Sequence, residues 1–265
     1  MTPTLSMRLH TWLHATLQAP CVLQPLIGGS SNALYRVECQ QHAYVLRVNA
    51  PSDIAFSVNR QCEAKVLDLI QPYPWAVQVI RNDVAQGLCL MQTYTPVTQS
   101  LSAVGLGQVY EAIHALQSIA IASHDLPLLT IDYTALTAQY QQQLDQFPHL
   151  RAAQWLQEWQ QGLTALPPLP PVLVHQDLHA GNLCWNTVEP RQLILIDWEY
   201  AGLGNAWFDA VPLHNWGFSE AQLRSLTAFQ HLTTRQWREG LQQAKHLIQV
   251  LTDLWYWARS HAQER

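Results

Sequence analysis

Two short apolar runs in the last third of the sequence each end in an aspartate. Residues 172–174 lead to Asp177, and residues 193–196 lead directly to Asp197. A short apolar run bounded by polar residues is typical of a buried strand. A short β-hairpin between the two aspartates would bring them, together with Asn182, around one point. This constraint fixes the local fold more tightly than any other feature of the chain.

Three oxygen-bearing side chains that converge in this way suit a hard cation such as Mg²⁺. A phosphoryl-transfer site of the kinase type needs such a set. Asp177 would orient the attacking hydroxyl group, and Asn182 and Asp197 would hold the metal. The alternative is that all three residues only cap loops.

A zinc site is a second alternative, because His175 and His179 lie four residues apart in the same stretch. With Asp177 they could form a metal-dependent hydrolase. The two histidines fall in a loop rather than on one helix face, however, and the sequence gives no clustered third ligand.

The first third of the chain is rich in strand patterns and the remainder is mainly helical, which predicts an α+β fold in two lobes. A turn is expected at Asn82-Asp83 and a connector at Thr93–Val97. The expected helices cover Leu5–Leu17, Asp53–Ile70, Leu101–Trp159 with breaks near Pro127 and Pro148, and the region from Ser219 to the end. The expected strands, besides the two above, cover Val22–Ile27, Leu34–Cys39, Tyr44–Val48, Val77–Ile80 and Leu88–Met91.

The stretch His175-x-Asp177-x-x-x-x-Asn182, followed by Asp197-Trp-Glu-Tyr-Ala, resembles the aminoglycoside phosphotransferase and choline kinase superfamily. The sequence of this second motif is most similar to that of bacterial choline or thiamine kinases. The resemblance implies a bilobal, protein-kinase-like fold. Its small N-lobe, residues 1–94, holds an antiparallel sheet, and its larger, mainly helical C-lobe covers residues 95–265. The resemblance also implies that His175 and Asp209 brace the catalytic loop.

The resemblance extends upstream to a nucleotide-binding region. Tyr44-Val-Leu-Arg47-Val resembles the phosphate-binding strand, although protein kinases carry Lys where this chain has Arg47. Glu63 lies on an apolar helical stripe and needs a partner, for which Arg47 is the natural choice; the alternative is an exposed Glu63 at the stripe edge. The glycine-rich stretch Gly28–Asn32 resembles the nucleotide loop of the family. The alternative is a plain hairpin turn. The candidate nucleotide-binding residues in this stretch are Gly29, Ser30, Ser31 and Asn32.

Residues 91–94 follow a predicted strand and match the position of the hinge at which adenine docks. Gln92 and Tyr94 are the candidates there. An ordinary strand end would give the same pattern, and the sequence does not separate the two interpretations.

Eleven tryptophans bear on the substrate. A cationic ligand binds well over aromatic faces, although most tryptophans pack in a core. The candidates for substrate contact are Glu199, Trp198, Trp216 and Trp255. Asp and Glu total only 19, which favours a small single cation over a polycationic aminoglycoside that needs a broad acidic groove.

These observations predict an ATP-dependent kinase, with Mg²⁺, that acts on a small cationic alcohol of the thiamine or choline and ethanolamine type. The alternatives are a nucleotide-binding pseudokinase and an aminoglycoside or sugar phosphotransferase. The net charge of −5, with 14 Lys and Arg and no basic run, disfavours a nucleic-acid partner. No apolar stretch is long enough to span a membrane. Five scattered cysteines indicate reduced thiols and a cytoplasmic protein. The oligomeric state is left open.

Overall fold

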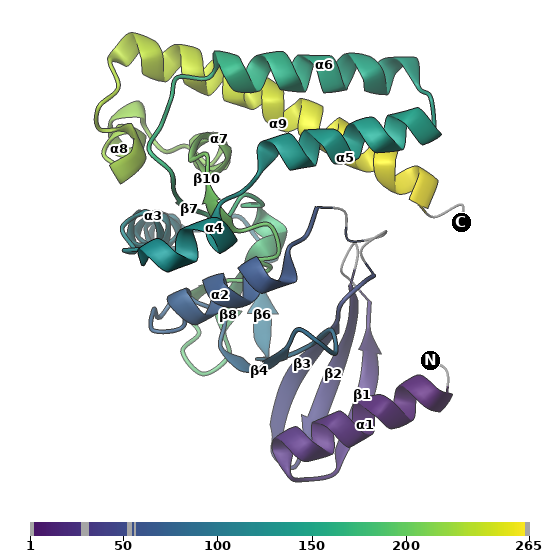
Figure 1. Cartoon of the computed structure of the whole chain (residues 1–265). Coiled ribbons are helices and arrows are strands. Elements are labelled where there is room, and N and C mark those ends of the chain that lie inside the picture. Colours follow the sequence, from purple (N-terminus) through teal and green to yellow (C-terminus); the bar gives the residue numbers. More distant parts are fainter. Residues whose placement is uncertain (1–2, 28–31, 52–54, 56, 263–265) are drawn as a thin grey trace.

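The computed structural model describes residues 3–27, 32–51, 55 and 57–262. Figure 1 shows two lobes: a sheet with one helix against it, and a larger body of helices. The predicted α+β, protein-kinase-like arrangement is confirmed. The helices are α1 (Pro3–Leu17), α2 (Arg60–Ile70), α3 (Ala103–Gln117), α4 (Leu126–Leu129), α5 (Tyr133–Gln146), α6 (Leu150–Ala165), α7 (Trp207–Asn215), α8 (Glu220–Arg224) and α9 (Thr234–Ala262).

The N-lobe is built on an antiparallel sheet of five strands in the order β1-β2-β3-β5-β4. Apolar residues of α1 at helical spacing, Leu9, Trp12 and Leu13, pack on one face of this sheet. Successive strand residues point to opposite faces. Leu46 therefore joins this core, while its neighbour Arg47 projects from the other face toward α2. The strands are β1 (Cys21–Leu26), β2 (Ala33–Cys39), β3 (His42–Val48), β4 (Val79–Asp83) and β5 (Leu88–Gln92).

Helix α2 lies in the N-lobe segment of the sequence but packs into the C-lobe core. Its buried residues Cys62, Val66 and Ile70 belong to the same apolar cluster as the C-lobe helices. The expected start at Asp53 is wrong, because the helix begins at Arg60. Asn59 caps it, accepting hydrogen bonds from the backbone of residues 61 and 62.

Two further expectations in the N-lobe are wrong. Asn82 and Asp83 do not form a turn but end β4, where they pair with Cys89 and Leu88. The expected connector at Thr93–Val97 instead contains a short strand. This strand, β6, belongs to a three-stranded sheet of the C-lobe in the order β6-β8-β9. The chain therefore enters the second lobe directly after β5.

The C-lobe carries two small sheets, whose strands lead into the segments that contain Asp177 and Asp197. Strands β8 and β9 form the predicted hairpin between Asp177 and Asp197, and β7 pairs with β10. Asp177 follows the end of β7, and Asp197 follows the end of β9. Their bounds are β6 (Tyr94–Pro96), β7 (Val172–Val174), β8 (Leu183–Asn186), β9 (Leu193–Leu195) and β10 (Gly202–Gly204), with short 3₁₀ turns at Ser123–Asp125, Ala180–Asn182 and Thr227–Phe229.

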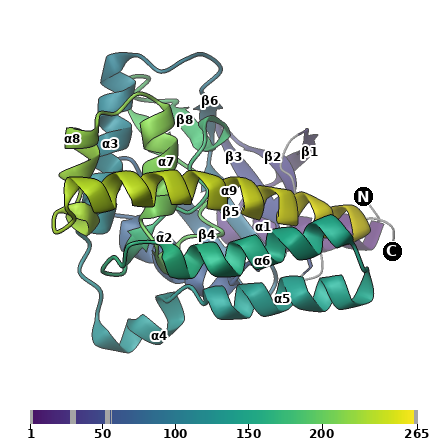
Figure 2. The ribbon, with the colours of Figure 1, turned by 90° about the horizontal axis from the view of Figure 1, so that it is seen from above.

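Helices α5, α6 and α9 lie side by side over the C-lobe (Figures 1 and 2). Helices α6 and α9 approach closely at Gly162, where an added Cβ would meet Leu247 at 2.4 Å. Both predicted breaks are confirmed. Pro148 lies between α5 and α6, and Pro127 lies in the short α4 that separates α3 from α5. Helix α7 was not expected, since Pro212 sits inside it.

In the part of the chain that the structure describes, no helix is both long and apolar enough to cross a membrane.

Candidate active site

The loop that follows β7 and carries Asp177, the candidate catalytic loop, is anchored by a buried carboxylate. Asp209, at the start of α7, accepts hydrogen bonds from the backbone N–H of His175 at 2.8 Å and of Gln176 at 2.9 Å. Gln176 has a left-handed backbone, with φ of 65°, a conformation that persists only where its surroundings hold it. Burial raises the pKa of Asp209 to about 6, although the two N–H donors oppose the shift.

His175 is completely buried beneath this loop, and both of its ring nitrogens are engaged. Nε2 lies 3.0 Å from the carbonyl oxygen of Ile196, and Nδ1 lies 3.4 Å from the N–H of Asp177. Because a carbonyl only accepts, Nε2 carries the proton and Nδ1 is the acceptor. Burial lowers the pKa of His175 to about 4. His175 is therefore a neutral brace with no lone pair left for zinc.

Asp177 and Asn182 are joined by direct hydrogen bonds. The Nδ2 of Asn182 donates to the Oδ2 of Asp177 at 3.1 Å and to its backbone oxygen at 2.9 Å. Burial disfavours ionisation of Asp177, but the hydrogen bond and charge of His179 outweigh it and lower its pKa. The Asp177 side chain is 37% exposed. It is an ionised carboxylate that a ligand can reach.

Asp197 follows β9 in a left-handed conformation, with φ of 65°. Burial, and then the charge of Glu199, raise its pKa to about 7; the nearby charge of Asp177 acts in the same direction. A buried carboxylate with other carboxylates near it needs a cation. Since Nδ2 of Asn182 is used by Asp177, the Oδ1 of Asn182 is the atom left to join Asp197 around a hard cation. The donor set fits Mg²⁺.

The predicted pairing of Arg47 with Glu63 is confirmed. The guanidinium of Arg47 meets both carboxylate oxygens, at 2.6 and 2.8 Å, and both side chains are buried. Burial works against the charged form of Glu63, but Arg47 and then Arg60 outweigh it and lower its pKa. Asp197 is close enough to raise the pKa of Arg47 as well. Strand β3, which carries Arg47, and the segment after β9, which carries Asp197, therefore lie near one another.

Arg60 is a site residue that reasoning from the sequence missed. It contacts Glu63 at 2.8 Å, Glu199 at 3.0 Å and Asn32 at 2.8 Å. Glu199, a candidate for substrate contact, is buried against Arg60 and Asn32 instead. The signal available in the sequence was the position of Arg60 one helical turn before Glu63.

The remaining nucleotide candidates are distributed unevenly. Gly29, Ser30 and Ser31 lie outside the described residues. The N–H of Gln92 donates to the carbonyl of Gln78 at 3.0 Å, and the hydroxyl of Tyr94 accepts from the N–H of Gln78 at 2.8 Å. Between them, the hydroxyl of Thr93 is buried without a hydrogen-bond partner among the described residues.

The three tryptophan candidates have different surroundings. Trp198 is 1% exposed, and its ring lies 4.5 Å from that of His175, so it is a packing residue and not a substrate contact. Trp216 lies beyond the far end of α7 from Asp209 and packs on the C-lobe core. Only Trp255 reaches the site, where its Nε1 donates to the hydroxyl of Tyr200 at 3.2 Å.

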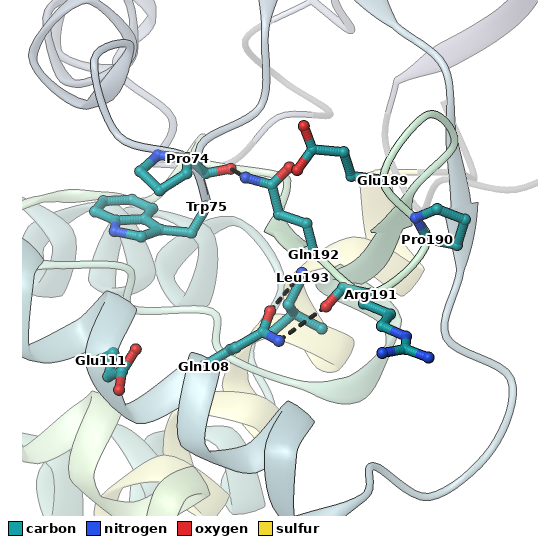
Figure 3. Close-up of a pocket in the computed structure, with 9 residues that line it drawn as sticks. All are labelled: Pro74, Trp75, Gln108, Glu111, Glu189, Pro190, Arg191, Gln192 and Leu193. Atoms are coloured by element: carbon teal, nitrogen blue, oxygen red, sulfur yellow. Dashed lines mark hydrogen bonds between the residues drawn. The ribbon is translucent and has the colours of Figure 1, made fainter.

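A pocket of about 650 Å³ lies elsewhere, between α3 and the turn that joins β8 to β9 (Figure 3). Gln108 holds this turn through the N–H of Leu193 and the carbonyl of Arg191. None of its lining residues belongs to the site above. The ring of Trp75 in its wall lies 5.9 Å from that of Trp198, which in turn packs against His175.

Comparison with known proteins agrees with this geometry. The sequence matches the family described as "APH: Phosphotransferase enzyme family" over residues 22–247. The chain belongs to this phosphotransferase family. No curated protein sequence gave a significant match to this family member.

Solved structures show the same fold as this phosphotransferase. Choline kinase LicA from Streptococcus pneumoniae is 16% identical, with a TM-score of 0.73 over 97% of this chain and 92% of that one. A macrolide 2'-phosphotransferase type I is 18% identical, with a TM-score of 0.66 over 99% and 96%. An ethanolamine kinase from Plasmodium vivax is 13% identical, with a TM-score of 0.59 over 91% and 82%. At these identities, the likeness concerns the fold.

Proposed function

We propose that this phosphotransferase is an ATP- and Mg²⁺-dependent kinase that phosphorylates the hydroxyl group of a small cationic alcohol. The observation that carries the proposal is the convergence of Asp177, Asn182 and Asp197 opposite the buried pair of Arg47 and Glu63. This set supplies a candidate base, two candidate metal-binding side chains and a cation for the phosphates, which are parts that phosphoryl transfer of the kinase type uses.

In this reaction, the hydroxyl oxygen of the alcohol attacks the γ-phosphorus of ATP. The bond from the γ-phosphorus to its bridging oxygen breaks, ADP leaves, and the hydroxyl proton passes to Asp177. Asp177 is ionised and partly exposed, so it can orient the hydroxyl and accept its proton. Arg47, held by both oxygens of Glu63, presents fixed positive charge to phosphate oxygens.

Asn182 and Asp197 would hold the metal ion. When bound, Mg²⁺ neutralises charge on the phosphate oxygens. The protein's own contribution is to hold these two side chains in place. The backbone N–H of Ile196 donates to the carbonyl of Asn182 at 3.0 Å, which ties the two metal-binding segments together directly.

The charges at the site favour a substrate with a single positive charge. Of the three neighbouring carboxylates, Glu199 is neutralised by Arg60 at 3.0 Å. Asp197 would be neutralised by the metal ion, which leaves Asp177, whose Oδ2 lies 3.5 Å from Nε2 of His179. A polycationic aminoglycoside would find little further negative charge here. This reasoning favours alcohols of the choline, ethanolamine or thiamine type over aminoglycosides and sugars.

Aromatic side chains beside these carboxylates support the same choice. Burial, followed by the charge of Glu199, raises the pKa of Tyr200, and Asp177 and Asp197 also contribute. Tyr200 and its partner Trp255 therefore lie at the edge of the acidic site. The guanidinium of Arg259 lies 4.8 Å from the ring centre of Trp255, so one face of this ring already has a cation against it. The substrate would use the opposite face or the edge of the ring.

An ADP-release assay with Mg-ATP tests the proposal. The panel contains choline, ethanolamine, thiamine, a sugar amine and an aminoglycoside, with Asp177→Asn as the matched inactive control. We expect ADP release with one cationic alcohol and none from the control. Release only with the aminoglycoside would overturn the substrate class. Nucleotide binding with no release across the panel would support the pseudokinase alternative.

A further inference from the structure

Arg60 occupies the centre of a polar cluster that joins three separate segments. Its Nη1 contacts the Oε2 of Glu63 at 2.8 Å and the Oε2 of Glu199 at 3.0 Å, and its Nη2 donates to the Oδ1 of Asn32 at 2.8 Å. Only 15% of the Arg60 side chain is exposed. The three acceptors belong to α2, to the metal loop after Asp197, and to the residue that precedes β2.

The cluster is closed on itself. The Nδ2 of Asn32 donates to the Oε2 of Glu199 at 2.8 Å, and the N–H of Ala50 donates to the Oδ1 of Asn32 at 3.0 Å. Asn32 thus bonds the strand end after β3, the helix α2 and the metal loop at once. The contacts of Asn32 with Arg60 and with Glu199 cross from the start of β2 to α2 and to the segment after Asp197, so the cluster links the two halves of the site.

The charges require Arg60 at this place. Glu199 is 5% exposed and lies two residues from Asp197. Without Arg60, its buried carboxylate would lose its ion pair beside a second carboxylate. The planar guanidinium reaches three acceptors together, which a lysine ammonium on a flexible stem cannot reproduce in the same geometry.

We propose that Arg60 is a positioning residue that fixes the metal loop, through Glu199, against the base of the nucleotide loop at Asn32. This inference rests on the proposed kinase function and deepens it. Arg60 holds the segment that binds phosphate and the segment that binds metal in one relative position. Nucleotide and metal therefore bind cooperatively because of this cluster.

Isothermal titration with ADP, in the presence and absence of Mg²⁺, tests this role without relying on turnover. We expect Arg60→Gln to weaken binding of Mg-ADP by about tenfold or more, and binding of metal-free ADP by less. Arg60→Lys should recover only part of the loss. Arg235→Gln is the matched control, because Arg235 forms an exposed ion pair on α9, and it should bind both forms like the wild type.

A double-mutant cycle decides whether Arg60 acts through Glu199. The double variant Arg60→Gln/Glu199→Gln should bind Mg-ADP no more weakly than the weaker single variant. Losses that multiply would overturn the proposal, and so would equal losses for ADP with and without Mg²⁺, which indicate general damage to the fold.

Asn32→Ala gives a second approach if Arg60→Gln does not fold, because it removes one arm of the cluster from the other side. It should also weaken Mg-ADP more than metal-free ADP. Different results would refute the proposed function and the proposed role of Arg60. A wild type that binds no nucleotide would refute the proposed function, whereas wild-type binding that these variants leave unchanged would refute only the role of Arg60.

Discussion

The two halves of the site are held in place by different kinds of interaction. In the catalytic loop, Asp209 binds two backbone N–H groups, and His175 binds a carbonyl and an N–H. In the other half of the site, Arg47, Glu63 and Arg60 are held by ion pairs between side chains. The loop is fixed within one lobe, and the ion pairs connect elements of both.

The comparison teaches where each half is vulnerable. Backbone donors cannot be mutated away, so the loop depends on the few side chains that accept from them. The ion-pair cluster is made of side chains alone, and the loss of one charge leaves another buried without its partner. We therefore expect substitutions in the loop to affect chemistry, and substitutions in the cluster to affect stability and nucleotide binding.

Asp177→Asn should produce the largest difference in effect between turnover and nucleotide binding. The amide keeps the size of the side chain but cannot accept the proton, so turnover should fall by about 10²–10⁴-fold. Binding of Mg-ADP, measured by titration, should stay close to that of the wild type. A turnover that does not change would contradict the role given to Asp177.

Glu63→Gln should show the opposite pattern. Arg47 and Arg60 both lose their shared carboxylate, and breaking a buried pair typically costs about 3–5 kcal/mol of unfolding free energy. Urea denaturation measures this loss. Glu239→Gln, in the exposed pair with Arg235, is the control and should cause no measurable change. Equal effects of the two substitutions would contradict the picture of a buried cluster.

Asp209→Asn tests whether the loop depends on its carboxylate. The amide can accept from only one of the two N–H donors and turns an NH₂ group toward the other. An unsatisfied buried donor costs about 1–3 kcal/mol. We expect a loss of stability in that range together with lower turnover, measured by denaturation and by ADP release. If turnover were fully retained, the loop would not need this anchor.

The smallest effect concerns pH. The pKa of His175 is lowered to about 4 in the folded protein, so the unfolded chain binds the proton more readily and stability falls as the pH drops below about 6.5. At pH 5.5, this amounts to about 1.4 kcal/mol.

The raised pKa of Asp209 acts in the opposite direction over the same pH range. The test is therefore the difference between the wild type and His175→Gln, each denatured at pH 7 and pH 5.5. The wild type should lose more stability than the variant. Parallel losses would show that His175 is not held neutral.

Much of the fold could be predicted from local patterns. The hairpin between Asp177 and Asp197 follows from two apolar runs, and the pairing of Arg47 with Glu63 follows from a charge on an apolar stripe. These features depend on neighbours in sequence or on one burial requirement. Helix α7 was not predicted, because Pro212 interrupts its pattern while its buried face still packs.

The errors at the site have a different origin. Arg60 and Glu199 meet only because α2 packs on the C-lobe, a placement that no local pattern encodes. Trp198 was a candidate for substrate contact because aromatic rings bind cations. Its burial in the core depends on the tertiary packing, which the local sequence does not reveal. Long-range contacts of this kind determine which charges face each other, and they were beyond the reach of spacing and periodicity.

The arginine at position 47 also decides which reagents can detect the protein. Nucleotide probes that acylate a lysine amine in kinases require a neutral amine beside the phosphates. Although burial opposes it, Glu63 raises the pKa of Arg47 further, so its guanidinium stays protonated. The chain has only two lysines, Lys65 and Lys245, and Lys65 pairs with Asp125 at 3.0 Å. A probe of this kind would therefore find a guanidinium, and no lysine amine, at position 47.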